Sequence, residues 1–269
     1  MGISLDKGGD GIATVTVDYP PVNAIPSAGW FELADTILAA GRDPDVGAVI
    51  LRAEGRGFNA GVDIKEMQQF EGFDHLIAAN RGCYAAFNAV YDCQVPVVAA
   101  VGGFCVGGGI GLVGSADCIV ASDDAVFGLP EVDRGALGAA THLARMVPPH
   151  MLRTLYFTSR TVTAAQLHNW GTVFEVTSRD ELDAAARRLA GEIAAKDTRV
   201  IRAAKEALNG IDPVDIKRSY RFEQGFTFEL NLAGVADEHR DEFVRSGENL
   251  DTRAKSDGTT GATDTTKES

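Results

Sequence analysis

The first half of the chain changes its hydrophobic period several times, and each period predicts a different element. Residues 11–18 alternate apolar and polar positions, which predicts a half-exposed strand. Ser27 is placed to cap a helix whose apolar residues recur at helical spacing over 30–38. The short apolar run at 46–51 predicts a buried strand. This half of the chain therefore begins as a strand–helix–strand pattern.

The middle of the chain predicts two helices, a buried strand and a glycine-rich turn. Helical spacing of apolar residues predicts a short helix over 63–70 and a longer one over 74–92. Residues 95–101 are continuously apolar, which is typical of a parallel strand covered on both faces. Residues 102–114 hold seven glycines, and we expect them to turn tightly into a helix.

The rest of the chain is largely helical in pattern. Short strands are predicted at 118–121 and 125–127, helix starts at Thr163, Ser178 and Thr198, and amphipathic helices over 179–195, 199–208 and 213–232. The predicted organisation is an α/β core domain over 1–200, a C-terminal helical oligomerisation region over 201–246 and a disordered tail over 247–269. We expect the helices at 213–245 to complete the acyl pocket of a neighbouring subunit.

Composition and charge narrow the class of protein. A net charge of −13 argues against a nucleic-acid or anionic-membrane surface, because both partners need clustered positive charge. The four cysteines show no metal-binding spacing, so we expect buried free thiols and no metal. Neither a signal peptide nor a membrane-spanning run is visible in the sequence. We therefore expect a cytoplasmic protein.

The glycine run contains a G-x-G-x-x-G pattern at Gly109, Gly111 and Gly114. It follows a predicted strand and opens a predicted helix, as a dinucleotide-binding fingerprint does. However, the next acidic residues come only about fourteen residues later, whereas the ribose-binding acid is expected about twenty residues on. Glycines that serve helix–strand packing are an equally good interpretation, and a nicotinamide-dependent dehydrogenase is a remote one.

A second segment gives the glycine run another meaning. Residues 58–67, Phe-Asn-Ala-Gly-Val-Asp-Ile-Lys-Glu-Met, also follow a predicted strand and open a predicted helix. Two such turns can each aim an unpaired backbone N–H into one space, where the helix dipoles favour negative charge. Two preorganised donors around one oxygen would form an oxyanion hole.

These segments, followed by Phe-Gly-Leu-Pro-Glu at 127–131, resemble the enoyl-CoA hydratase/isomerase (crotonase) family over residues 10–245. The resemblance implies a β-β-α spiral core with a helical C-terminal trimerisation region, assembly into homotrimers or hexamers, and an acyl-CoA thioester as substrate with no separate cofactor. By position in the family's motifs, the oxyanion amides are those of Val62 and Gly108. The residues implied to line the CoA pocket are Ala60, Asp63, Ile64 and Lys65.

The sequence departs from the hydratases of this family at one catalytic position. Hydratases carry two glutamates that hold the attacking water; one of them corresponds to Glu131, but Gly111 occupies the position of the other. Because glycine cannot transfer a proton, ordinary hydration is disfavoured, and Glu131 becomes the candidate general base. Asp133 and His142 lie near the expected acyl end as further candidates, although Asp133 could simply pair with Arg134 and His142 could be structural.

Four segments go further in resemblance: residues 20–27, 55–67, 102–114 and 225–232 are similar to the crotonase-like hydrolases that open the last rings in bacterial steroid degradation. That resemblance implies hydrolytic C–C cleavage, a retro-Claisen step, of a cyclic β-keto acyl-CoA. Two alternatives remain open at the level of sequence. One is an enoyl-CoA isomerase or hydratase, and the other is a catalytically silent scaffold of the same fold.

Overall fold

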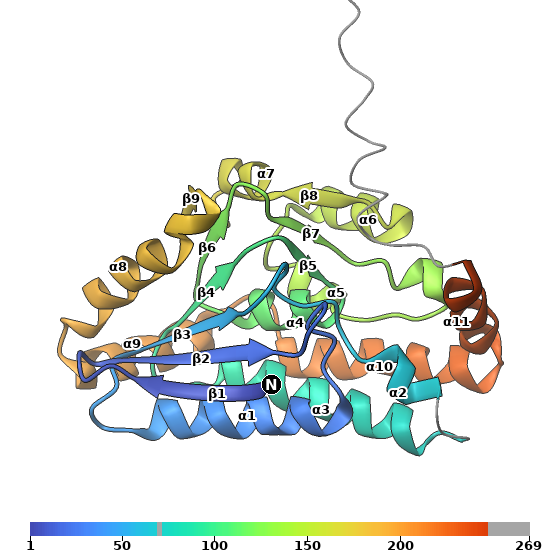
Figure 1. Ribbon diagram of the computed structural model, residues 1–269, viewed down its shortest axis with the longest axis horizontal. Helices are drawn as coiled ribbons and strands as arrows, with labels where there is room; N and C mark the ends of the chain where they lie inside the picture. Colours follow the sequence, from blue (N-terminus) through green and yellow to red (C-terminus); the bar gives the residue numbers. More distant parts are fainter. Residues whose placement is uncertain (69–71, 247–269) are drawn as a thin grey trace, which may run out of the picture.

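The centre of the molecule is a six-stranded sheet with the strand order β1-β2-β3-β4-β6-β9. The structure is a computed structural model that describes residues 1–68 and 72–246 (Figure 1). All neighbouring strands in this sheet are parallel except β1 and β2, which form an antiparallel pair. The strands are β1 (Gly2–Lys7), β2 (Ile12–Asp18), β3 (Ala48–Ala53), β4 (Val97–Val101), β6 (Cys118–Ser122) and β9 (Glu175–Thr177).

Both faces of the central strands are covered, which explains their continuous apolar sequence. In β4, Val97 and Ala99 point into the larger core, which α1 (Ser27–Arg42), α3 (Asp74–Tyr91) and α4 (Gly108–Ser115) complete. Val98 and Ala100 point to the opposite face, where α8 (Leu182–Ala194) covers them with a row of alanines. Figure 1 shows α1 and α3 on one side of the sheet and α8 on the other.

A second, three-stranded sheet holds the turn that precedes α4. Its order is β5-β7-β8, with β5 and β7 parallel and β7 and β8 antiparallel. The strands are β5 (Phe104–Val106), β7 (Val126–Gly128) and β8 (Thr161–Thr163). The short helix α7 (Ala164–Asn169) packs against β8, while α5 (Ala140–Leu143) packs against α4 and α6 (Pro149–Thr158) contacts the 3₁₀ turn η1 (Val132–Arg134). A second 3₁₀ turn, η2 (Arg179–Glu181), precedes α8. The turn at residue 107 therefore has a rigid strand on its N-terminal side.

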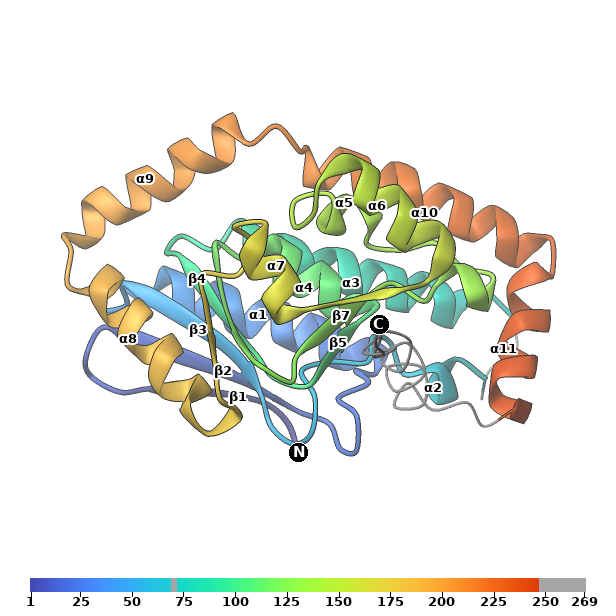
Figure 2. The same cartoon turned by 90° about the horizontal axis from the view of Figure 1, so that it is seen from above.

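The C-terminal helices lie around the margin of the core. They are α9 (Thr198–Ile211), α10 (Ile216–Leu232) and α11 (Val235–Ser246). Figure 2 shows α9 at the periphery, at the end of the molecule opposite α2 (Ile64–Gln68) and α11. The helix α10 instead packs against α3 and α5. The chain's last described helices thus occupy both ends of the fold.

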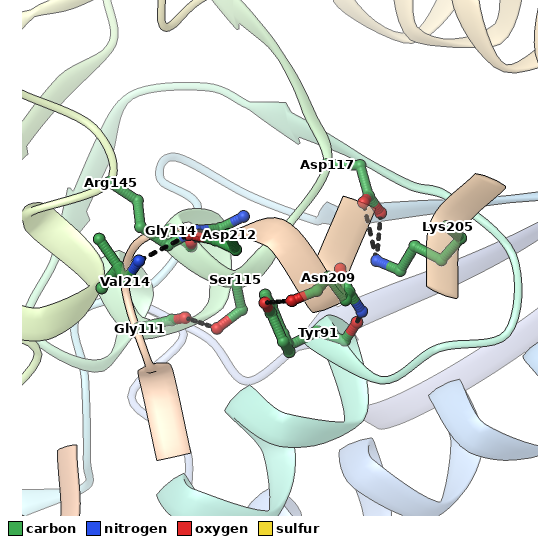
Figure 3. Close-up of polar contacts among 10 residues, drawn as sticks. All are labelled: Tyr91, Gly111, Gly114, Ser115, Asp117, Arg145, Lys205, Asn209, Asp212 and Val214. Carbon is green, nitrogen blue, oxygen red and sulfur yellow. Dashed lines mark hydrogen bonds and ion pairs between the residues drawn. The ribbon is translucent and has the colours of Figure 1, made fainter. Parts of the chain in front are cut away.

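Polar contacts hold α9 to the core in place of apolar packing. Within α9, which the structure describes completely, Lys205 is the one buried side chain, and its ammonium lies 2.6 and 2.8 Å from the carboxylate oxygens of Asp117 (Figure 3). Asn209 donates a hydrogen bond to the carbonyl of Tyr91 at 2.7 Å and accepts one at its own carbonyl from the Tyr91 hydroxyl. These contacts leave the apolar face of α9 turned outward.

Most predicted elements are confirmed within a few residues, and the differences have local causes. The helix start at Thr163 is confirmed, because this side chain forms a capping box with Gln166. Ser27 does not cap α1; it is the first helical residue, and Glu66 accepts from its N–H at 2.7 Å. The strands β1, β5, β8 and β9 were not predicted from the sequence, and the expected tail lies outside the described residues.

Three further predictions concerned the cysteines, membrane-spanning segments and metal binding. All four cysteines are free thiols, and three of them are buried. In the described part of the chain, no helix combines the length and the apolar character needed to cross a bilayer. The described residues also contain no cluster of three His, Cys, Asp or Glu side chains that could hold a metal ion.

Candidate active site

The turn before α2 is fixed to strand β5 by main-chain hydrogen bonds. The amides of Phe58 and Asn59 donate to the carbonyl of Phe104 at 2.8 and 3.3 Å, and Val106 donates to the carbonyl of Asn59 at 2.9 Å. The Asn59 side chain then accepts from the amide of Gly61 at 2.9 Å. The turn at 58–61 and the strand that leads into the glycine run therefore form one rigid unit.

The two turns touch each other where glycine allows it. Gly61 and Gly107 have φ values of +89° and +60°, a region that favours glycine. A Cβ atom on Gly61 would lie 3.2 Å from the amide nitrogen of Gly108, and one on Gly108 would lie 2.7 Å from the ring of Trp30. Any larger side chain would push the two turns apart.

The amides of Val62 and Gly108 are both available as donors. Ile25 donates to the carbonyl of Gly61 at 2.9 Å and accepts from Asp63 at 3.0 Å, so the N–H of Val62, between them, points away from Ile25. Gly108 is the first residue of α4, where amides have no partner within the helix. Neither amide donates a hydrogen bond within the described chain, and both residues line the same cavity.

That cavity is mainly apolar and opens to solvent. Its volume is about 130 Å³, close to the roughly 150 Å³ cavity that is known to accept benzene in another protein. It is therefore large enough for a carbon ring. Apolar side chains from α2, α3 and the loop after η1 make up most of its wall: Ile64, Met67, Leu76, Ala79, Phe87, Ala136, Leu137 and Ala139.

Glu131 is the one carboxylate that lines this cavity among the described residues. Its Oε1 lies 2.8 Å from where a Cβ on Gly107 would be, which places it beside the second turn. Its Oε2 is buried without a hydrogen-bond partner. Burial raises the pKa of Glu131 to about 8, opposed by the charge of Arg134 and assisted by that of Glu223. The arrangement suits a base that binds a water molecule from the cavity.

A second carboxylate, Glu223, which was not predicted as a site residue, supports this wall from behind. Glu223 on α10 accepts hydrogen bonds from the amides of Ala140 and Thr141 at 2.8 and 3.2 Å and from the hydroxyl of Tyr156 at 3.2 Å. Burial raises the pKa of Glu223, and these donors oppose the rise. The signal that the sequence offered is only a spacing: Glu223 lies four residues before Thr227 and so on the same face of the helix predicted over 213–232.

The position of the missing hydratase glutamate is filled by an aromatic ring. A Cβ on Gly111 would lie 2.2 Å from the Phe87 ring, so there is no room for any side chain at this position. Gly109 and Gly114 are packed in the same way, against Asn59 and against the backbone of His142. The three glycines therefore serve close packing, which is the structural interpretation and not the dinucleotide one.

The structure brings together five of the residues singled out from the sequence. Ala60, Val62, Ile64, Gly108 and Glu131 all line the cavity. Ala60, Val62 and Ile64 come from the turn before α2 and from α2 itself, Gly108 begins α4, and Glu131 follows β7.

The other four predicted residues do not line the cavity. Asp63 accepts hydrogen bonds from the amides of Lys65 and Glu66 and so caps α2, while Lys65 is exposed. Asp133 is also exposed on η1. His142 is fully buried behind the wall, and burial lowers the pKa of this imidazole to about 3, so it is neutral.

Aromatic rings surround that histidine. The ring centroids of Phe87 and Tyr220 lie 4.9 and 5.0 Å from that of His142. Neither ring nitrogen of His142 has a hydrogen-bond partner among the described residues. The geometry therefore fits a packing role better than proton transfer.

The C-terminal helices also contribute to the cavity. The helix α10 lines the cavity of its own chain through Tyr220, Thr227 and Asn231, and a role in a neighbouring subunit's pocket stays a prediction. The helix α10 reaches this cavity because it packs against α3 and α5, whose buried polar groups it satisfies through Glu223 and Gln224.

Comparisons with known proteins identify two similar relatives that are named alike. The chain is 75% identical over 247 residues to a "(7aS)-7a-methyl-1,5-dioxo-2,3,5,6,7,7a-hexahydro-1H-indene-carboxyl-CoA hydrolase" of Rhodococcus jostii (strain RHA1), with 92% of this chain and 96% of that one covered. It is 73% identical over 235 residues to the protein of the same name from Mycobacterium tuberculosis, with 87% and 95% covered.

Solved structures share the fold. A carnitinyl-CoA hydratase from Mycobacterium avium superposes with a TM-score of 0.80 at 28% identity, covering 91% of this chain and 96% of that one. An enoyl-CoA hydratase/isomerase from Xanthobacter autotrophicus Py2 gives a TM-score of 0.82 at 26% identity, covering 98% and 99%. The sequence profile described as enoyl-CoA hydratase/isomerase matches residues 7–227, most of the chain. The protein belongs to the enoyl-CoA hydratase/isomerase family.

Proposed function

We propose that this protein is a ring-opening hydrolase that cleaves a carbon–carbon bond of a cyclic β-keto acyl-CoA in steroid degradation and leaves the thioester intact. The substrate we propose is the hexahydroindene carboxyl-CoA for which the two similar relatives are named. The observation that carries the proposal is one cavity-lining carboxylate, Glu131, with an unpaired Oε2, beside two unpaired amides, and with no room for a second carboxylate at Gly111.

The first step is the addition of water to the ring ketone. Ionised Glu131 removes a proton from a water molecule in the cavity, and the water oxygen bonds to the ketone carbon. The ketone oxygen becomes an alkoxide. Because one carboxylate suffices for this step, the loss of the second hydratase glutamate is no obstacle.

The second step breaks the carbon–carbon bond. As the alkoxide reverts to a carbonyl, the bond between that carbon and the α-carbon of the thioester breaks, and its electron pair forms the thioester enolate. The enolate oxygen accepts hydrogen bonds from Val62 and Gly108, which stabilise the developing charge. Glu131 returns its proton to the α-carbon, and the new carboxylic acid ionises. Neither reaction step exchanges electrons with a cofactor, and CoA takes part only as a portion of the substrate.

Ordinary hydration is disfavoured by the same geometry. A hydratase holds its water between two glutamates, whereas here the Phe87 ring occupies the position of the second one. The apolar ring also excludes a water molecule from that side of the cavity. The alternative of an enoyl-CoA hydratase therefore has no observation in the site that favours it.

Turnover of two thioesters separates the hydrolase from the hydratase. We expect the hexahydroindene thioester to be opened rapidly and crotonyl-CoA to be hydrated at least 100-fold more slowly. The Glu131→Gln variant should lose about 100-fold or more in kcat on the first thioester, because it removes the base. Rapid hydration of crotonyl-CoA would contradict the assignment, and an unchanged Glu131→Gln rate would contradict the role of this residue.

The assembly that we propose is a homotrimer or a dimer of trimers. The outward face of α9 supports self-association, because Val200, Leu208 and Ile211 there are 64%, 61% and 76% exposed. A row of apolar side chains on a helix is costly to leave in water. The free thiols fit the reducing cytoplasm, which is where we place the protein.

A further inference from the structure

The proposed reaction creates two negative oxygens, and the two amides can hold only one of them. The enolate oxygen of the thioester occupies the hole at Val62 and Gly108. The second oxygen is the former ketone oxygen, first an alkoxide and then part of a carboxylate. It forms beside Glu131, itself an acid, with the acid Glu223 behind the wall. An anion in this place needs a positive partner.

Arg134 is the one cationic side chain that lines the cavity among the described residues. It ends η1, and its amide donates to the carbonyl of Glu131 at 2.9 Å. In such a turn the side chains at i and i+3 lie above one another, so Arg134 and Glu131 lie on the same side of it. The charge of Arg134 is also near enough to lower the pKa of Glu131.

Backbone hydrogen bonds hold Glu131 and Arg134 in a fixed relative position. The amide of Ala136 also donates to the carbonyl of Glu131, at 3.0 Å, and Gly135 closes the turn with a φ of +63°. The two charged side chains therefore enter the cavity from one closed turn, whose geometry substrate binding need not create. A guanidinium has five N–H donors, so it can keep a protein partner and still bind a ligand oxygen.

We propose that Arg134 is the second anion-binding group of this site. Its guanidinium donates to the ring ketone oxygen as water adds, and it then holds the carboxylate that ring opening leaves behind. The inference rests on the proposed function. It adds a catalytic residue and a product-binding site for a CoA thioester that ends in a carboxylate.

The test uses binding as well as turnover. Heptanedioyl-CoA carries a terminal carboxylate on a chain of the length that opening a six-membered β-keto ring produces, and heptanoyl-CoA is its uncharged counterpart. Calorimetry should show that the wild type binds heptanedioyl-CoA more tightly, and that Arg134→Gln loses this preference by about 10- to 100-fold. Arg134→Lys should retain part of it, because the charge remains but the planar fork is lost.

Turnover supplies the second readout. At the high-pH plateau, where Glu131 is ionised in every variant, we expect Arg134→Gln to lower kcat/KM for the hexahydroindene thioester by about 10- to 100-fold. The acid limb of its profile should also move to higher pH, since a positive charge beside Glu131 is gone. The exposed Arg160 provides the matched control, and Arg160→Gln should change none of these quantities.

The outcomes separate this inference from the proposed function. The role of Arg134 would be overturned, and the proposed function kept, by the following result. The wild type opens the ring, and the Arg134→Gln variant keeps both the plateau rate and the carboxylate preference within twofold. A wild type that does not open the ring would overturn the proposed function instead. If Arg134→Gln fails to fold, the Arg134→Lys variant decides: wild-type values for both readouts overturn the inference.

Discussion

Glu131 shows how the surroundings of one residue set its chemistry. Its Oε2 is buried without a partner, so the ionised form loses the water that would stabilise it, and its pKa rises to about 8. Arg134 limits that rise. The result is a carboxylate near the pKa that a general base needs at neutral pH, without a second carboxylate among the described residues of the same cavity wall.

The pH dependence of turnover follows from this pKa. The base must be ionised, and a group with a pKa of about 8 is ionised in roughly a tenth of the molecules at pH 7. We expect kcat/KM for the hexahydroindene thioester to rise about tenfold per pH unit below pH 8 and to level off above it. Steady-state rates between pH 6 and 9.5 provide the measurement, and a flat profile over that range would be incompatible with Glu131 as the base.

Stability should change with pH in the opposite direction. The ordinary pKa of a glutamic acid is 4.5, and that of Glu131 in the folded protein is about 8. At a pH between these two values, the folded protein keeps the Glu131 proton that the unfolded chain loses. The folded state then binds more protons, so this group lowers stability as the pH rises through that window. Replacing Glu131 by Gln should therefore raise the melting temperature by roughly 2–4 °C at pH 8.5, corresponding to about 1 kcal/mol in a chain of this size.

The same comparison near pH 4.5 serves as the control. Both proteins are then uncharged at position 131, and their melting temperatures should agree more closely than at pH 8.5. Calorimetric scans at the two pH values provide the test. An effect of Glu131→Gln that is equal at both pH values would argue against a buried, ionisable carboxyl at this position.

At the scale of elements, α3 and α4 decide which reactions the cavity can support. Phe87 from α3 packs over Gly111 of α4, and this contact occupies the position at which a hydratase would present its second glutamate. Phe87 also contacts the rings of Trp30 and Tyr220, with centroids at 5.7 and 5.3 Å. The absence of a second glutamate therefore results from the packing of two helices, and not only from the loss of one side chain.

Alanine at two helical glycines tests that packing. Gly111→Ala should destabilise the protein by about 1–3 kcal/mol, because its Cβ would overlap Phe87. Gly191 in α8 has no atom within 4 Å of the corresponding position, so Gly191→Ala should stabilise by about 0.5–1 kcal/mol. Urea unfolding of both variants measures the difference. Equal effects of the two substitutions would show that Gly111 is not tightly packed.

The elements that the sequence predicted well are those with a strong local period. The strand at residues 95–101 and the helix at 74–92 appear as β4 and α3 with nearly the expected ends. β5, β8 and β9 have only three residues each, which is too short for a period to show, and pairing with distant strands creates them. β1 is a different case, because it pairs with the next strand β2 and most of its residues are exposed, so it contains little apolar pattern.

The site was predictable where a motif fixed the backbone and unpredictable where side chains meet across the fold. The turns at Val62 and Gly108 converge on one cavity as expected, and Glu131 joins them. His142 could not be placed from sequence, because its distance from the cavity depends on the rings of Phe87 and Tyr220, which come from α3 and α10. Single polar residues carry little such information.

At the scale of the whole molecule, α9 turns its polar face inward and its apolar face outward. Lys205 and Asn209 hold it to the core, while Val200, Leu208 and Ile211 face solvent in one chain. This is the reverse of the arrangement expected for a helix on a monomer. Another protein surface is therefore expected to cover α9, and a second copy of this chain is the partner that we propose.

Charged substitutions on that face test the assembly. Leu208→Lys with Ile211→Lys should shift the protein to smaller species, because burying two ammonium groups in an apolar interface is costly. Light scattering coupled to size-exclusion chromatography measures the mass. Glu206→Lys, on an exposed position outside the apolar row, is the control and should keep the wild-type mass. A monomeric wild type, or an unchanged mass for the double variant, would contradict this interface.

The central claim is that water opens the ring while the thioester remains intact, and turnover in H₂¹⁸O tests it most directly. Mass spectrometry of the product from the hexahydroindene thioester should show one added water molecule, with ¹⁸O in the new carboxylate and with CoA still attached. If free CoA were released and ¹⁸O appeared in the acid that had been the thioester carbonyl, the enzyme would cleave the thioester, and the proposed role of the Val62 and Gly108 amides in holding an enolate would be wrong.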